Sequence, residues 1–407
     1  MSHQLPDAAT EEAAVPRPER LAGVDVARAL AVLGMFAVHL GVGSVGLLGG
    51  DAAETFHSAV RGNSAGLFAF LAGLSLALMT GRTVPVSGPR LHRQRVRVVT
   101  RALVLALLGG VLDVLGAPVA VILTYYGGFF LLAAPLLRLR AGLLTVLAAV
   151  VAVAGPQVSF VVRDALGESE PYRSSSFNGV GDLLVTGYYP ACTFMAFVLA
   201  GMAVGRLDLR SRRVRAGMAA AGAGLAALGY GLSWLLLYPG GGADRLLDQE
   251  VSQQHATRLS EVDPALLGPM REWLGDRMAD LHGQVPTDSA WWLVVASPHS
   301  GTSFEIAAVV GTSLVVLAVC LLLADAAGPL LYPLAAVGAM ALTVYASHIV
   351  VMAWQDMSSQ DTAPWRLEAF LAGALVLATG WRLAVGRGPL EWMVARLADV
   401  GERLGSG

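Results

Sequence analysis

The stretch RLAGVDVARALAVLGMFAVHLGVGSVGLLGGDAAETFH, residues 20–57, decides the fold class. Its first part is an apolar run long enough to cross a bilayer as one helix, which takes about 20 residues. His39 interrupts this run, and His57 follows its far end. Ionisable side chains at membrane depth are costly, so by default they mark functional positions. The stretch predicts an integral membrane protein whose chemistry is centred on these two histidines.

The composition of the whole chain agrees with a membrane protein. Hydrophobic residues make up 55% of the 407 residues and charged residues only 14%, whereas soluble domains carry about 25% charged residues. The 28 basic residues, all arginine, are scattered in short loops, so no nucleic-acid partner is expected. The two cysteines and the histidines lack metal-ligand spacing, and no metal is expected.

Ten apolar segments follow one another along the chain. We therefore predict an all-α fold, a polytopic integral membrane helical bundle with about ten transmembrane helices. The expected spans are residues 24–48, 65–81, 102–116, 118–137, 141–161, 184–205, 216–237, 302–324, 333–354 and 365–385.

The distribution of arginine predicts the orientation. Three short loops are rich in arginine, at residues 82–101, 138–140 and 206–215. All three fall on the same side of the membrane, which the positive-inside rule makes cytoplasmic. An even number of spans places the N- and C-termini on this side too, in a cell (inner or plasma) membrane.

Three segments make up the predicted domain organisation. Residues 1–20 are polar and acidic and contain proline, which is typical of a disordered tail, here cytoplasmic. Residues 21–386 form the transmembrane domain, and residues 387–407 form a cytoplasmic C-terminal segment. The domain includes an extracytoplasmic loop, 238–301. Within this loop, residues 270–281 have the pattern of an amphipathic helix, which lies either in the headgroup plane or on the protein's own outer face.

Titratable residues in other spans are expected at the same depth as His39 and His57. Because lipid cannot solvate such groups, a shared polar cavity near the outer face is the simplest explanation. Each residue also has a plainer interpretation, as a hydrogen-bonding residue between helices, an ordinary loop histidine or an interfacial carboxylate. The further candidates for this cavity are Asp113, Glu305, Tyr345 and His348.

A second polar group is expected at the cytoplasmic face. Asp25 and Arg28 are spaced i and i+3, and the simplest interpretation is an ion pair on one helical face. Topology alone explains the arginines of the 82–101 loop, although so basic a loop also suits the phosphates of a cofactor. The candidates for cofactor binding are therefore Asp25, Arg28, Arg93, Arg97 and Arg101.

Several short motifs resemble one family of membrane enzymes. The pattern R-L-x-x-V-D-x-x-R begins at Arg20, and F-H-S-A-V-R-G precedes the second span. Together with GMAVGRLDL, VGAMALTVYASHIV and GPLEWMVARL further along, it is similar to the heparan-alpha-glucosaminide N-acetyltransferase-like family of transmembrane acyltransferases, including its bacterial relatives. The resemblance covers most of the chain from Arg20 onward.

The resemblance implies transfer of an acetyl group from cytosolic acetyl-CoA to an amine or hydroxyl on the opposite side of the membrane. The family's essential histidine matches His57, and a polar position eleven residues after the motif arginine falls on His39. Three features depart from the family pattern. Ala29 replaces a glycine, the loop before His57 is longer than in the animal enzyme, and residues 64–70 lack an expected aspartate.

The resulting hypothesis is a membrane-bound acyltransferase. His57 acts as general base or as a transient acyl carrier, and His39 orients the acceptor or stabilises the developing oxyanion. The expected partners are the lipid bilayer, acetyl-CoA or another acyl-CoA, and a glycan, glycolipid or other envelope acceptor. A homodimer is compatible with this hypothesis.

Two other classes of function stay open. Buried histidines and carboxylates around a cavity also suit a proton-coupled transporter. A non-catalytic membrane scaffold or sensor is the third interpretation, because no sharp catalytic motif exists beyond the resemblance.

Overall fold

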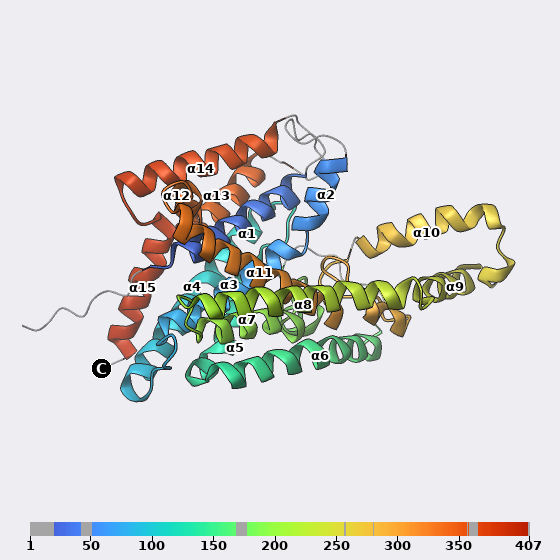
Figure 1. Ribbon diagram of the computed structural model, residues 1–407, viewed down its shortest axis with the longest axis horizontal. Helices are drawn as coiled ribbons and strands as arrows, with labels where there is room; N and C mark the ends of the chain where they lie inside the picture. Colours follow the sequence, from blue (N-terminus) through green and yellow to red (C-terminus); the bar gives the residue numbers. More distant parts are fainter. Residues whose placement is uncertain are drawn as a thin grey trace, which may run out of the picture.

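The computed structural model describes residues 20–41, 51–167, 177–255, 258–279, 281–355, 357 and 365–405. Most of the tail predicted at residues 1–20 therefore lies outside the described residues. Within these ranges all regular structure is helical, without a strand, which confirms the all-α prediction. The elements shown in Figure 1 are α1 (Ala22–Leu40), α2 (Asp51–Val60), α3 (Asn63–Met79), α4 (Gly88–Val114), α5 (Ile122–Ala133), η1 (Ala134–Arg138), α6 (Ala141–Ala165), η2 (Asp182–Thr186), α7 (Ala191–Gly205), α8 (Arg212–Leu237), α9 (Gly242–His255), η3 (Leu259–Glu261), α10 (Pro264–Ala279), η4 (Ala290–Val294), α11 (Ser303–Ala327), α12 (Tyr332–Ala339), α13 (Ala341–Trp354), α14 (Arg366–Ala384) and α15 (Pro389–Gly405).

Six segments of the described chain are long and apolar enough to cross a membrane. They are α1, the segment Ala52–Met79 that includes α3, and the helices α6, α8, α11 and α14. The helices α12 and α13 are bent by 77° at their junction and make a seventh if they form one broken span. Two further apolar segments, α5 with η1 and α7, are shorter. The protein is thus a multi-pass membrane protein, whereas the count of ten spans and the orientation stay predictions.

The spanning helices fall into an inner and an outer group. In α1 and in the segment with α3, 72% of the spanning window is buried inside the protein, against 11% in α6, 22% in α8 and 11% in α14. Figure 1 shows α6 and α8 along one side of the bundle and α14 along the other. The outer helices therefore face lipid, and the protected interior is built on α1 and α3.

Glycine allows a close helix contact in this interior, between α3 and α7. A Cβ atom on Gly73 would lie 1.9 Å from the carbonyl oxygen of Val198, and a Cβ atom on Gly201 would lie 1.8 Å from that of Phe70. Small residues let backbones approach in a membrane, where van der Waals packing holds helices together. Any larger residue at either glycine would push the two helices apart.

Arg206 ties three helix ends together at one end of the bundle. The side chain is buried directly after α7, and its Nη1 donates to the carbonyl oxygens of Ala77, Thr80 and Arg82. Its Nη2 donates to Thr80 Oγ1 and to the carbonyl of Leu137. The last carbonyls of a helix lack partners within the helix, so a planar guanidinium with five donors suits them. This contact explains the arginine of the GMAVGRLDL motif.

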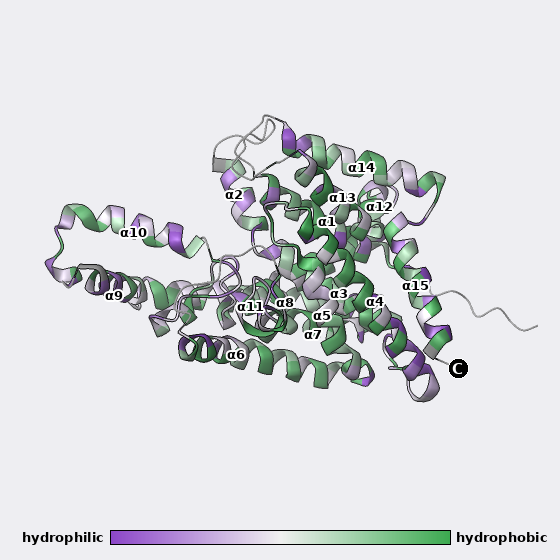
Figure 2. Cartoon of the chain, turned by 180° about the vertical axis from the view of Figure 1, so that it is seen from behind, coloured by the Kyte–Doolittle hydropathy of each residue, from purple (hydrophilic) through white to green (hydrophobic). Residues whose placement is uncertain are grey.

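The helices α9 and α10 extend beyond the opposite end of the bundle (Figure 1). Figure 2 shows polar and apolar residues mixed on both, in contrast to the largely apolar bundle. Leu274 and Met278 of α10 are buried in a cluster with Leu247 of α9 and Trp292 of η4. The amphipathic helix predicted at 270–281 therefore packs on the protein itself, which is the second of its two interpretations.

We predict that Arg206→Ala lowers the free energy of unfolding by about 3 kcal/mol, because it leaves buried carbonyl groups without partners. Arg206→Lys should restore little of this, since one ammonium cannot serve both sets of acceptors. Thermal denaturation in detergent measures the change. The control is Arg213→Ala, which removes an exposed arginine in the first turn of α8. Equal losses in the two alanine variants would contradict this role of Arg206.

Candidate active site

A hydrogen-bonded pair of histidines joins α1 to α13 inside the bundle. His39 Nδ1 lies 2.9 Å from His348 Nε2, and the two rings are stacked with centroids 5.2 Å apart. His348 is buried, and its ring also contacts Phe36 at 4.5 Å and Tyr345 at 5.0 Å. A hydrogen bond between two imidazole nitrogens needs one proton, so one of the two nitrogens donates and the other accepts, and the tautomers of the two rings are coupled. We call His39 and His348 the histidine pair.

A cavity of about 840 Å³ lies among α1, α3, α4, α5 and the segments from α12 to α15. We call it the arginine cavity, because arginines from four parts of the chain line it. Such a concentration of positive charge inside a membrane domain favours an anionic ligand. The lining arginines are Arg20, Arg28, Arg101, Arg382 and Arg387.

The arginine cavity leads from a charged end to an aromatic layer. On α3 its wall runs from Met79, which Arg101 contacts, to Phe68, roughly 16 Å along the helix. The Phe68 ring stacks on Tyr126 at 5.2 Å and on Tyr345 at 6.3 Å. Because Tyr345 also contacts His348, an aromatic layer separates the inner end of the cavity from the histidine pair.

The hydroxyl of Tyr126 gives the inner end of the cavity a polar group. It is buried and has no hydrogen-bond partner among the described residues. Buried hydroxyls normally have a partner. The neighbouring Tyr345 hydroxyl does have one, since it accepts a hydrogen bond from the Ile122 amide at 3.3 Å. A ligand in the arginine cavity would supply the partner that Tyr126 lacks.

The ion pair predicted for Asp25 and Arg28 is confirmed. Arg28 Nη1 lies 2.8 Å from Asp25 Oδ1, and Arg20 binds the same buried carboxylate. The other Arg28 nitrogen, Nη2, donates to Ser75 Oγ at 2.7 Å. Arg28 therefore lines the arginine cavity with both terminal nitrogens already hydrogen-bonded, and its main effect there is its positive charge.

The arginines predicted on the 82–101 loop separate into two groups. Arg97 pairs with Asp399 and Glu402 of α15 at 2.6 and 2.8 Å, and Arg93 lies 4.0 Å from Glu402. These two arginines dock α15 on α4 and do not line the cavity. Arg101 does line it.

Sequence reasoning missed the arginines that the C-terminal segments contribute, Arg382 and Arg387. Arg382 lies near the end of the last predicted span, 365–385, and Arg387 follows this span, where arginine is explained by topology. Nearby, Glu391 of α15 accepts hydrogen bonds from the amides of Leu342 and Thr343. These amides begin α13 after the break, and a carboxylate there satisfies amides that have no partner in the helix. The motif GPLEWMVARL was the only signal for this contact.

The structure places three predicted residues, His57, Asp113 and Glu305, away from the histidine pair. His57 lies on the short helix α2, half-buried and on the same face as the buried Ala53. Asp113 lies near the end of α4 and is partly exposed. Among the described residues, neither of these last two side chains has a hydrogen bond or ring contact to His39, His348 or Tyr345.

Glu305 organises a loop at the α2 end of the bundle. Its carboxylate accepts hydrogen bonds from the amides of His299 and Gly301, at 2.6 and 2.5 Å, and from Ser300 Oγ at 3.2 Å. Pro298 of this loop packs against Gly62 at the start of α3. Glu305 thus has a structural role, because its carboxylate holds the loop 299–301 in place.

His299 was not predicted, and the Glu305 loop holds it in an unusual conformation. Its φ is 60°, a left-handed value that is uncommon outside glycine. Its carbonyl accepts a short bond from the Gly283 amide, and its ring contacts Tyr188 and Tyr189. Burial lowers the pKa of His299 to about 3, and nearby positive charges act in the same direction. No sequence spacing indicated this site.

A second cavity of about 840 Å³ adjoins the Glu305 loop. We call it the α2 cavity, because Thr55, Phe56, Ser58 and neighbouring residues of α2 line it. The rest of its wall comes from α1, α3, α8, α11 and α14. The N-terminal part of α3 lines the α2 cavity, and the C-terminal part lines the arginine cavity. The two cavities thus occupy opposite ends of one helix.

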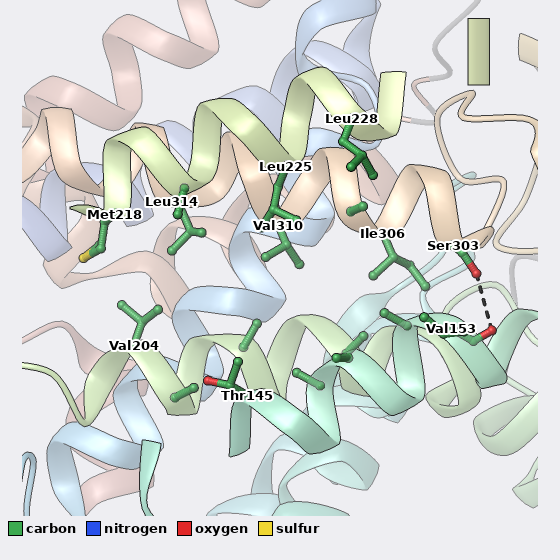
Figure 3. A pocket seen from close by; sticks show the side chains of 18 of the residues that line it. Thr145, Val153, Val204, Met218, Leu225, Leu228, Ser303, Ile306, Val310 and Leu314 are labelled. Atoms are coloured by element: carbon green, nitrogen blue, oxygen red, sulfur yellow. Dashed lines mark hydrogen bonds between the residues drawn. The ribbon is translucent and has the colours of Figure 1, made fainter. Parts of the chain in front are cut away.

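A third hollow, between α6, α7, α8 and α11, is apolar (Figure 3). Residues such as Val204, Leu225 and Val310 line it, and we call it the lipid groove. The hydroxyl of Ser303 at its edge donates to the carbonyl of Val153. It offers no titratable group, so it is not a candidate for acid–base chemistry.

These features define a multi-pass helical membrane protein with a hydrogen-bonded histidine pair inside the bundle and a cavity at each end of α3. A family model described as heparan-alpha-glucosaminide N-acetyltransferase, catalytic, matches residues 20–238, just over half of the chain. The chain belongs to this family of membrane acetyltransferase-like enzymes. The match contains His39 and His57 and ends after α8, so His348 lies outside it. A search of curated proteins found no match.

The pKa of His299 predicts part of the pH dependence of stability. The unfolded chain binds a proton at this residue near pH 6.5, and the folded protein only near pH 3. The unfolded state is therefore favoured as pH falls from 6.5 towards 3, by up to about 1.4 kcal/mol per pH unit. Above this window the contribution to folded stability is complete.

We expect His299→Asn to flatten the fall of melting temperature on acidification, because asparagine tolerates the left-handed backbone but does not titrate. Thermal denaturation between about pH 7 and 4.5 measures this slope. His92→Asn, at an exposed histidine, should keep the wild-type slope. An unchanged slope in His299→Asn would contradict the prediction.

Proposed function

We propose that the protein transfers an acetyl or other short acyl group from acyl-CoA to an amine or hydroxyl acceptor on the other side of the membrane. The observation that supports this most is the arginine cavity, which joins a cationic end to an aromatic layer beside the histidine pair. Its volume of about 840 Å³ lies in the range of pockets for cofactor-sized ligands.

The residues of the arginine cavity fit the parts of acetyl-CoA. Arg101, Arg382 and Arg387 would bind the phosphates of the nucleotide end, since guanidinium groups form paired hydrogen bonds with phosphate. The apolar wall of α3 would hold the pantetheine arm. The Tyr126 hydroxyl, unpartnered within the described chain, would donate to a carbonyl oxygen of that arm.

The chemical step follows from the family position of His57. The nitrogen or oxygen of the acceptor attacks the thioester carbonyl carbon, and His57 accepts the proton that the acceptor loses. The carbon–sulfur bond then breaks, and the proton passes from His57 to the CoA thiolate. The histidine pair orients the acceptor or donates to the developing oxyanion. In a second version His57 carries the acyl group transiently. The acceptor is a glycan, glycolipid or other envelope component.

The orientation that suits this reaction places the arginine cavity at the cytoplasm, where acyl-CoA is found. The arginine-rich loops lie on this side by the positive-inside rule. We propose ten spans in the transmembrane domain 21–386 and cytoplasmic N- and C-terminal segments. The α2 cavity and the loop 238–301 then face the outside of the cell membrane.

One observation favours a proton-coupled carrier as the second candidate. The helix broken between α12 and α13 resembles the discontinuous helices of transporters. Within the described residues no second bent pair accompanies it. Acetyl-CoA should raise the melting temperature of an acyltransferase by mass action and leave a carrier of unrelated solutes unchanged.

We predict that Arg101→Ala and Arg387→Ala each weaken acetyl-CoA binding about tenfold or more, because each removes a charge-assisted contact to phosphate. Titration calorimetry or the acetyl-CoA-induced thermal shift measures the affinity. Arg213→Ala removes an exposed arginine that does not line the cavity and should bind normally. Wild-type affinity in both cavity variants would exclude this cavity as the donor site.

We expect His57→Ala to lower the rate of acyl transfer from labelled acetyl-CoA by about 10²- to 10⁴-fold, the usual contribution of a general base. Acetyl-CoA should still raise the melting temperature of this variant, because His57 does not line the arginine cavity. Glu54→Ala changes an exposed residue on the same helix and should retain activity. If His57→Ala retained wild-type transfer, His57 would have no catalytic role.

A further inference from the structure

The α2 cavity changes from polar to apolar along the direction of the spanning helices. Glu305 of α11 lines its end near α2, Val309, Thr312 and Ser313 follow along the helix, and Val316 lines its deep part. From Glu305 to Val316 the helix rises roughly 16 Å. Across the cavity, Leu30 and Leu33 of α1 and Leu371 of α14 also line it. A molecule that fills this space needs a polar end and a long apolar end.

The apolar part of the cavity faces the bilayer. Leu30 lies midway along the spanning helix α1 and is 42% exposed. Exposed side chains at this depth of a membrane protein meet hydrocarbon rather than water. An apolar chain can therefore enter from the side without crossing an aqueous phase.

The polar part of the cavity is a built network. Thr312 Oγ1 donates to Asn63 Oδ1 at 2.7 Å, and Asn63 Nδ2 donates to the Tyr230 hydroxyl at 3.2 Å. Ser313, one residue further along α11, is 1% exposed, and its hydroxyl has no partner among the described residues. A pure hydrocarbon would leave this hydroxyl unsatisfied, at a cost of about 1–3 kcal/mol. A polar linkage in the occupant would satisfy it.

We infer that the α2 cavity binds a lipid-anchored acceptor. Its alkyl or polyprenyl chain lies along α1 and α11, its polar linkage lies beside Ser313, and its amine- or hydroxyl-bearing headgroup lies against α2. This inference rests on the proposed acyl transfer and adds the class of substrate, an amphiphile held in the membrane. The headgroup then meets the helix that carries His57, while the donor occupies the opposite end of α3.

The lipid groove of Figure 3 provides an internal comparison. It has a similar volume, about 720 Å³, but its lining is apolar except for Thr145 and Ser303, whose hydroxyls are bonded to backbone carbonyls. Such a groove suits the tail of any membrane lipid. Only the α2 cavity combines an apolar entrance with a polar end among the hollows described above.

The test uses dodecyl glucosaminide with a diazirine in its chain, photolysed with the full-length protein in lipid nanodiscs. Mass spectrometry of the labelled peptides locates the chain. We expect labelling concentrated on α1 and α11 and displaced by unlabelled dodecyl glucosaminide but not by methyl glucosaminide. Labelling of α6, which does not line the α2 cavity, as strong as that of α1 and α11, or equal displacement by both competitors, would overturn the inference.

Two substitutions that fill the cavity sharpen the test. Val316→Trp fills its deep part, and Leu30→Trp narrows its exposed entrance without crowding the core. Each should lower specific labelling about tenfold, a loss of about 1.4 kcal/mol of binding. Leu322→Trp adds the same side chain at an exposed position of α11 outside the cavity and should label like the wild type. If Val316→Trp and Leu30→Trp were labelled to the same extent as Leu322→Trp, the inference would be contradicted.

The acetyl-CoA thermal shift, measured on the same samples, separates the two proposals. If acetyl-CoA stabilises the protein but labelling is unspecific, the acyltransferase proposal stands and the lipid-anchored acceptor does not. If acetyl-CoA has no effect while labelling concentrates on α1 and α11, the cavity binds an amphiphile and the proposed acyl transfer fails.

Discussion

The hydrogen bond between His39 and His348 is the interaction on which the rest of the site depends. It joins α1 to α13 across the interior of a bundle whose outer helices face lipid, where imidazole has no water to bind. A membrane protein retains such polar groups only when other protein groups satisfy them. The pair therefore links α1 to α13, the helix that follows the 77° break after α12.

The two cavities give this arrangement its direction. The arginine cavity ends at an aromatic layer against the histidine pair, and the α2 cavity occupies the other end of α3. Two arginines stabilise the packing around these cavities. Arg206 binds the C-terminal end of α3 and the end of η1, and Arg97 of α4 pairs with α15. A donor with phosphates and an acceptor with a headgroup would thus approach one region from opposite sides, without a continuous aqueous passage through the membrane.

Local sequence patterns predicted some features of this site and failed for others. The Asp25–Arg28 pair follows from i, i+3 spacing, and the apolar runs predicted helices. The contact of His39 with His348 spans 309 positions, so the sequence indicated a shared depth and could not indicate the bond. In the sequence, Arg382 and Arg387 look like arginines that only mark the cytoplasmic end of a span. Their place in the arginine cavity depends on how α15 packs on the bundle, which the sequence does not show. His299 depends on a left-handed backbone that no spacing reveals.

The most direct measurement is a cryo-EM map of the protein in lipid nanodiscs with acetyl-CoA. We predict density for the nucleotide among Arg101, Arg382 and Arg387, with the pantetheine arm extending along α3 past Tyr126 towards the histidine pair. Density for acetyl-CoA at another site, or an unliganded arginine cavity under conditions where acetyl-CoA demonstrably binds, would contradict this account.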